Sequence, residues 1–248
     1  MRQRYGDATV HGLLPGLTLP DNPPPSDWTP ATRIVDGERL RSLLDAATHR
    51  WYAPRHVAAA LAWKSYSYWV TLPAVLGYAA AHRVPLTTAE DVLVRFHDHR
   101  PFLTVALRPG TRIAVLRSDP LAASGAPNIR VVRNEAALLV AFRKALLDRH
   151  LEPVMAALRS TIHIGRRTLL GSVASAVAYG IARSAHVLPG PPVKVAGDLL
   201  EALDVADLVE LAEDQTGAVV VRRRTCCLAF VLPEPKICSG CPVPRLAA

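Results

Sequence analysis

The stretch TLLGSVASAVAYGIA, residues 168–182, is the most apolar segment in the later part of the chain and decides the expected fold. It is bracketed by Arg166, Arg167 and Arg183, and it is too short to cross a bilayer, which takes roughly 20 helical residues. We therefore predict a buried helix from about Thr168 to Ser184. Its many Gly, Ala and Ser residues would let another backbone segment pack very close to it.

Helical patterns continue on both sides of this segment. Apolar residues recur at spacings of three and four from Asp36 onward, and Pro54 is a favoured first-turn residue for a second helix through RHVAAALAWKSYSYWV. Pro73 is expected to break or kink that helix. Further helices are predicted from the N-cap Asn134 through EAALLVAFRKALLDRH, over about residues 151–160, and in AGDLLEALDVADLVELAED, residues 196–214.

Strand patterns lie between these helices. FLTVALRP and TRIAVLR are separated by Pro109-Gly110, a turn signal, which predicts an antiparallel hairpin. IRVVR is a third expected strand, and GAVVVRRRTCCLAFVL is typical of a strand or hairpin arm.

The order of these elements favours an α+β fold, mostly helical, with a small antiparallel sheet and a C-terminal cysteine-rich, cluster-binding tail, because strands and helices do not strictly alternate. We expect a flexible lead over residues 1–33, which contains PDNPPPSDWTP. A helical and strand half follows over residues 34–133, and a helical region over residues 134–248 ends in the tail, residues 222–248.

Composition narrows the function classes. Half of the residues are hydrophobic and the net charge is +8, so the chain can build a core and would attract anionic partners. The basic residues are scattered without interleaved aromatics, and this argues against nucleic-acid binding. No signal-peptide core or membrane span is evident, so we expect a cytoplasmic protein, with a peripheral position on the inner membrane face left open. Neither a GxGxxG nor a P-loop motif is present, which argues against a bound nicotinamide or flavin.

All four cysteines of the chain, Cys226, Cys227, Cys238 and Cys241, fall in the tail. Disulfides would need an oxidising compartment, so a metal site is the favoured interpretation. The pair Cys238 and Cys241 forms an ordinary C-x2-C knuckle. The adjacent pair is awkward for a single zinc ion, because neighbouring side chains of an extended strand point to opposite faces. Four thiolates spread over two irons suit a [2Fe–2S] cluster, although the residues alone leave zinc open.

The tail RRRTCCLAFVLPEPKICSGCPV resembles the C-terminal signature of the FhuF-type ferric-siderophore reductases, in which such a Cys set holds a [2Fe–2S] cluster. HLEPVMAALRSTIHIGRRTLLGSVASAVA resembles the helical segment before that tail more loosely. Relatives carry Trp and Asn beside the glycine that corresponds to Gly171, where this chain has Leu170 and Ser172, so no polar substrate contact is carried over there.

The resemblance implies a function. The chain would pass one electron at a time from the cluster to a ferric siderophore of the hydroxamate class and so release Fe(II). A ferredoxin or flavoprotein reductase would supply the electrons. Two alternatives remain: a [2Fe–2S] sensor or siderophore-binding protein without turnover, and a zinc-stabilised interaction module.

Two further groups of residues are candidates for steering the substrate or the donor. Arg222, Arg223 and Arg224 directly precede the cysteines and could stabilise a reduced cluster or attract an acidic donor, although a charged surface arm explains them equally well. Tyr66 and Trp69 lie three apart on a predicted helix, where they would form either core packing or an aromatic wall beside a siderophore.

Overall fold

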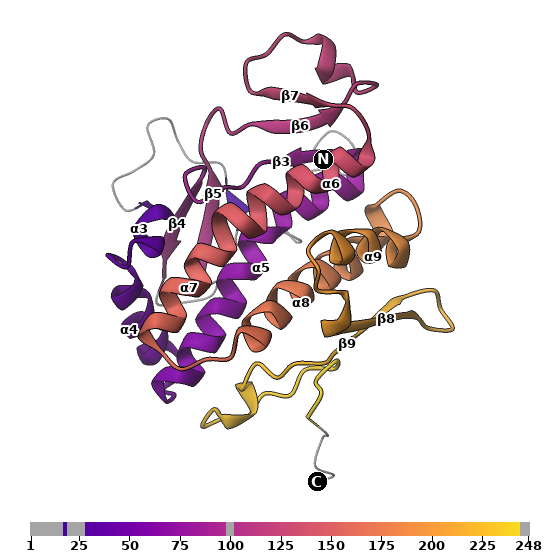
Figure 1. The fold of residues 1–248 in the computed structure, drawn as a ribbon. Helices are drawn as coiled ribbons and strands as arrows, with labels where there is room; N and C mark the ends of the chain where they lie inside the picture. Colours follow the sequence, from indigo (N-terminus) through magenta and orange to yellow (C-terminus); the bar gives the residue numbers. More distant parts are fainter. Residues whose placement is uncertain (1–16, 19–27, 98–101, 244–248) are drawn as a thin grey trace.

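The computed structural model describes residues 17–18, 28–97 and 102–243, which form a mostly helical α+β fold with small sheets, as the sequence predicts (Figure 1). A short helix, α3 (Thr32–Val35), precedes the main helices. These are α4 (Leu40–Trp51), α5 (Arg55–Ala81), α6 (Glu135–Arg143), α7 (Glu152–Thr161), α8 (Arg166–Ser184) and α9 (Pro192–Ala202). Short 3₁₀ turns cover Pro120–Ala123, Ala185–Val187, Ala206–Leu208 and Ala229–Val231.

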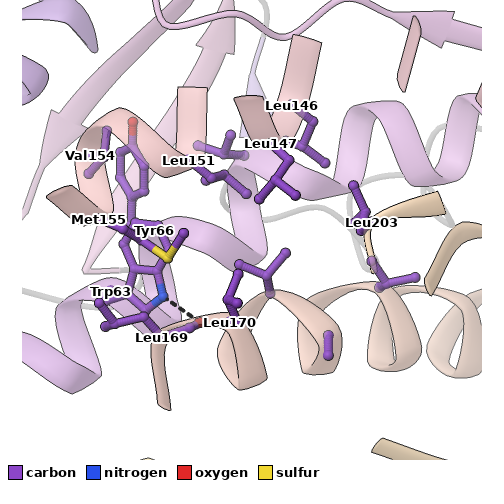
Figure 2. Packing of buried hydrophobic residues seen from close by; sticks show 14 of the residues in the cluster. Trp63, Tyr66, Leu146, Leu147, Leu151, Val154, Met155, Leu169, Leu170 and Leu203 are labelled. Atoms are coloured by element: carbon purple, nitrogen blue, oxygen red, sulfur yellow. Dashed lines mark hydrogen bonds between the residues drawn. The ribbon is translucent and has the colours of Figure 1, made fainter. Parts of the chain in front are cut away.

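Helices α5 and α8 pack side by side in the middle of the fold (Figure 1). Helix α5 continues through Pro73, which was expected to break or kink it, and buries side chains around most of its circumference. A Cβ on Gly180 would lie 2.8 Å from Leu72 Cδ2, so the close approach expected of α8 is confirmed. Trp63 of α5 donates its indole N–H to the carbonyl oxygen of Leu169 on α8 at 2.8 Å (Figure 2).

Helices α6 and α7 are joined without a break by a π-helix over Lys144–Leu151. The Asn134 side chain caps α6 as predicted, accepting from the Ala137 amide at 3.0 Å. The helix expected over about residues 151–160 is confirmed as α7, although no break separates it from the preceding helix. The π-helix carries His150 into the core, where its Nε2 lies 2.5 Å from Tyr66 Oη and its Nδ1 lies 2.8 Å from the Thr87 carbonyl oxygen.

The strands form three small sheets. The first has the order β1-β5-β4-β2, the second β3-β6-β7 and the third β8-β9. Their bounds are β1 (Leu17–Thr18), β2 (Thr29–Pro30), β3 (Arg83–Pro85), β4 (Val92–Phe96), β5 (Leu103–Leu107), β6 (Ile113–Leu116), β7 (Ile129–Val132), β8 (Val209–Glu213) and β9 (Val219–Arg223). The third sheet lies on the side of α8 that faces away from α5 and α7 (Figure 1).

Two local predictions are wrong. The expected hairpin does not form, because β5 is paired on both edges, by β1 and by β4, and β6 joins the second sheet instead. The helix expected over residues 196–214 ends at Ala202, and Asp204 then adopts a left-handed backbone with φ of 58°. Beyond it Val209–Glu213 pairs with the β-branched strand β9, and this pairing outweighs the helical spacing.

Part of the expected flexible lead is held by the fold. Strand β1 pairs with β5 and strand β2 pairs with β4, while Ala31 is fully buried. The rest of residues 1–27 lies outside the described residues. The division into an N-terminal and a C-terminal half stays a prediction.

Candidate functional site

The tail leaves β9 and folds back over α8. Directly after the adjacent cysteines, Leu228 adopts a left-handed backbone with φ of 62°, and its amide donates to Cys226 Sγ at 3.3 Å. A bulky residue in this conformation is strained, so the surroundings must impose it. The chain therefore turns immediately after the two adjacent cysteines.

The C-x2-C knuckle is tied to the end of β9. The Cys241 amide donates to the Cys238 carbonyl at 3.1 Å, which closes the turn, and the Arg223 amide donates to the Gly240 carbonyl at 2.8 Å. A Cβ on Gly240 would lie 2.0 Å from the Val221 carbonyl oxygen, so only glycine allows this approach.

A second glycine sets the tail against α8. A Cβ on Gly171 would lie 1.8 Å from Thr225 Oγ1, one residue before the adjacent cysteines. Small residues of α8 therefore allow close packing on two of its faces, one toward α5 and one toward the tail.

These constraints bring all four cysteines to the wall of one pocket of about 420 Å³, which we call the cysteine pocket. Cys227 is buried and the other three are half-buried. The remaining walls are Trp51, Leu61, Lys64, Ala229, Phe230, Leu232, Pro235, Lys236 and Ile237. Among the described residues, no three His, Cys, Asp or Glu side chains form a ready group for a single metal ion.

Two cations lie against the buried cysteine. Lys64 Nζ of α5 is 3.6 Å from Cys227 Sγ, across 163 residues of sequence. Arg223 is 3% exposed, its guanidinium neighbours Cys227, and its Nε and Nη2 atoms find no hydrogen-bond partner among the described residues. Burial alone would raise the pKa of the Cys227 thiol, but the charges of Lys64 and Arg223 outweigh it and lower that pKa. The pKa of Cys226 is raised, chiefly by burial.

Four cysteines in one pocket are consistent with an anionic iron–sulfur centre, although their side chains are not gathered around a single point. Four thiols share one pocket, as the cluster requires, and a buried guanidinium with unsatisfied N–H groups would be costly unless negative charge lies nearby. The cysteines would hold the cluster, while Lys64 and Arg223 would offset its charge.

A second pocket of about 550 Å³, which we call the aromatic pocket, adjoins the first and shares with it Trp51, Leu61, Lys64 and Cys238. Its volume lies in the range of small-molecule sites. Helix α5 contributes Ser65, Tyr68 and Trp69, helix α8 contributes Ser172, Ser175, Ala176, Tyr179 and Arg183, and the knuckle contributes Ser239. A ligand here would lie next to the sulfur of Cys238.

The structure separates the candidate steering residues. Trp69 lines the aromatic pocket, whereas Tyr66 lies in the core beside Trp63 and Met155 (Figure 2). The three arginines diverge in the same way: Arg222 is exposed and 3.8 Å from Glu210, Arg224 is exposed, and Arg223 is buried beside Cys227. Alternation along the end of β9 explains the difference.

Sequence reasoning missed Lys64, Tyr68, Tyr179 and Arg183. A signal for two of them was present, since Ser172, Ser175, Tyr179 and Arg183 form a polar stripe at spacings of three and four on an otherwise apolar helix. Lys64 carried no such signal, because a single lysine on a long helix is ordinary.

Comparison with known families finds a match over residues 61–206 to the family described as ferric iron reductase FhuF-like transporter. The chain belongs to this family. The matched region is more than half of the chain and carries Lys64, Trp69 and Arg183, but it stops before the cysteine tail. The family's description names the reduction of ferric iron, an oxidoreductase activity.

No curated protein matches the chain. Within the described residues, no helix combines the length and apolarity that a membrane crossing requires.

Proposed function

We propose that this protein reduces ferric siderophores by one electron through a [2Fe–2S] cluster held by Cys226, Cys227, Cys238 and Cys241. The observation that carries the proposal is the shared wall of the two pockets. All four thiols line the cysteine pocket, and one of them, Cys238, also lines a pocket large enough for a chelate. Membership of a ferric iron reductase family agrees with this arrangement.

When bound, the cluster would supply one electron, which converts Fe(III) of the chelate to Fe(II). The chelate then releases its metal more easily, because oxygen chelators hold the softer, less charged ferrous ion weakly. No proton transfer is required of the protein. Its residues would orient the chelate against Cys238, with Trp69 and Tyr68 as apolar walls.

An external donor protein, of the ferredoxin or flavoprotein class, would replace the electron. Arg222, Arg224 and Lys236 are exposed within the cysteine tail and would attract an acidic donor. The chelator implied by the sequence resemblance is a hydroxamate, and this finer point is independent of the one-electron step.

The test begins with anaerobically purified protein, which should show thiolate-to-iron absorption and, after reduction, an EPR signal of a [2Fe–2S] centre. The protein is reduced with dithionite, freed of reductant and mixed with a ferrous trap and a panel of ferric trihydroxamate, tris-catecholate and citrate complexes. At least one complex should reoxidise the cluster and yield one Fe(II) per cluster. Colourless, zinc-loaded protein would refute the cluster, and an inert reduced cluster would leave only the binding or sensing alternative.

The variant Cys238→Ser tests the ligand set. We expect loss of the visible absorption and of bound iron and sulfide, because one of four cluster ligands is gone. Ser160→Ala, exposed at the end of α7, is the control and should keep both. An unchanged spectrum in Cys238→Ser would show that this thiol is not a ligand.

A further inference from the structure

The charged residues that line the two pockets are all of one sign. Of the described residues that line them, none is Asp or Glu, while Lys64, Lys236 and Arg183 are cations. The buried Arg223 adds a fourth positive charge beside Cys227. Such a concentration of one sign favours a ligand of the opposite sign.

Arg183 is an exposed residue that lines the aromatic pocket, and it has no carboxylate partner among the described residues. Its guanidinium carbon lies 5.4 Å from the ring centre of Tyr68 and 6.0 Å from that of Tyr179, and its Nη1 donates to Tyr68 Oη at 3.1 Å. Arg167, near the other end of the same helix, by contrast pairs with Asp207 at 2.9 Å. Arg183 is therefore oriented by neutral groups and keeps its charge for a ligand.

The charge of a bound cluster also counts. The negative charge of four thiolates and two sulfides exceeds the positive charge of two ferric ions, so an oxidised [2Fe–2S] cluster would be an anion. Lys64 and Arg223 are the cations that touch Cys227, so they are the ones that would offset it. Arg183, which lines the aromatic pocket, has no carboxylate partner among the described residues, while Lys236 lines the cysteine pocket.

We infer that the aromatic pocket takes a ferric chelate with net negative charge, of the catecholate or carboxylate type, in preference to a neutral or cationic trihydroxamate. Three catecholates bring six negative charges to one ferric ion and leave an anion, whereas three hydroxamates only neutralise it. Tyr68 and Trp69 contribute aromatic rings to the wall of this pocket, and Arg183 offers the counter-charge. The inference rests on the proposed function only in taking the ligand to be a ferric siderophore.

Equilibrium binding of redox-inert gallium(III) chelates to the oxidised holoprotein tests it without turnover. Gallium(III) has the charge of Fe(III) but does not accept the electron, and Trp51 and Trp69 on the pocket wall serve as fluorescence reporters. We expect the anionic gallium tris-catecholate to bind more tightly than the cationic gallium complex of desferrioxamine B, and its affinity to fall as salt is raised. Equal or tighter binding of the hydroxamate complex would overturn the inference.

A variant that removes one positive charge tests whether Arg183 is responsible for the preference for an anionic chelate. Arg183→Gln should weaken binding of the tris-catecholate on the order of fivefold and leave the hydroxamate complex unchanged, as expected for one half-solvated ion pair. Arg167→Gln removes the same charge from the same helix outside both pockets and should change neither. Equal losses in the two variants would reduce the effect to net charge and refute a specific role of Arg183.

The two proposals fail separately. Preferential binding of hydroxamate, with reoxidation of the reduced cluster by its ferric complex, would refute the charge inference and keep the reductase. Tight binding of the tris-catecholate with no reoxidation by any ferric complex would keep the charge inference and refute the reductase.

Discussion

Leu228 forms the turn that follows the two adjacent cysteines. Its left-handed φ of 62° turns the chain immediately after Cys227, and the same turn aims its amide at Cys226 Sγ. An N–H group directed at a cluster sulfur is a means by which a protein tunes such a centre. The strained leucine thus directs its amide to a cysteine that lines the cysteine pocket.

Replacing Leu228 by Pro should abolish cluster binding, because Pro fixes φ near −65° and has no amide hydrogen. Leu228→Gly is the matched variant, since glycine adopts positive φ freely and keeps the N–H. We expect iron and sulfide near zero in the first protein and near the wild-type level in the second, with unchanged helical circular dichroism in both. Full iron content in Leu228→Pro would mean that the turn is not required.

Helix α8 supports the candidate site because glycines on two of its faces let neighbouring segments pack against its backbone. Gly180 admits Leu72 of α5, and Gly171 admits Thr225 of the tail. A helix with a leucine at either position would hold its neighbours farther away. Composition alone predicted this close packing, but not that one of the two faces receives the cysteine tail.

Gly171→Ala should lower the free energy of unfolding by about 1–3 kcal/mol, because its Cβ would overlap Thr225. Thr225→Gly in the same chain removes the overlapped atoms, so the double variant should lose much less than the two single losses combined. Gly197→Ala on α9 has nothing within 4 Å of its Cβ and should be neutral or stabilising. Urea unfolding measures all four; additive losses would contradict the contact.

The whole molecule is held together by a buried polar link as well as by its apolar core. His150 is fully buried between Tyr66 of α5 and the Thr87 carbonyl. Because a carbonyl can only accept, Nδ1 carries the proton and Nε2 accepts from the Tyr66 hydroxyl. Burial lowers the pKa of His150 to about 4, so the ring is neutral in the folded state at ordinary pH.

Acid should therefore weaken the fold. From about pH 6.5 down to about pH 4 the unfolded chain binds a proton at His150 that the folded chain does not, so stability falls as pH falls, by up to roughly 3 kcal/mol. His150→Gln should flatten this part of the profile of unfolding free energy against pH, whereas His186→Gln, at an exposed position, should not. Parallel profiles for wild type and His150→Gln would contradict the assignment.

How far the sequence predicts this molecule depends on how local each signal is. Spacing within one element predicted most of the helices, and the spacing of Cys226, Cys227, Cys238 and Cys241 singled out the tail before any fold was known. Pairing between strands was not predictable, since the partner of β5 is the unrecognised strand β4. The contact between Lys64 and Cys227 was not predictable either, because only the folded chain brings these two residues together.

Tyr66 and Trp69 show the same limit within one helix. Three residues apart, they share a side of α5, yet Tyr66 points to His150 while Trp69 reaches the aromatic pocket. Helix α5 is buried around most of its circumference, so periodicity does not distinguish its core side from its pocket side.

The cysteine pocket takes part of its wall from helices far away in the sequence, so iron bound there would report on folding in one direction only. The tail contributes only Cys227, Ala229 and Leu232 to the buried core of the described residues, so the helices are expected to pack without a bound cluster. The cysteine pocket takes walls from α4 and α5, so a metal bound there would be retained only while those helices are docked. Full iron content would certify an intact core, whereas missing iron would say nothing against it.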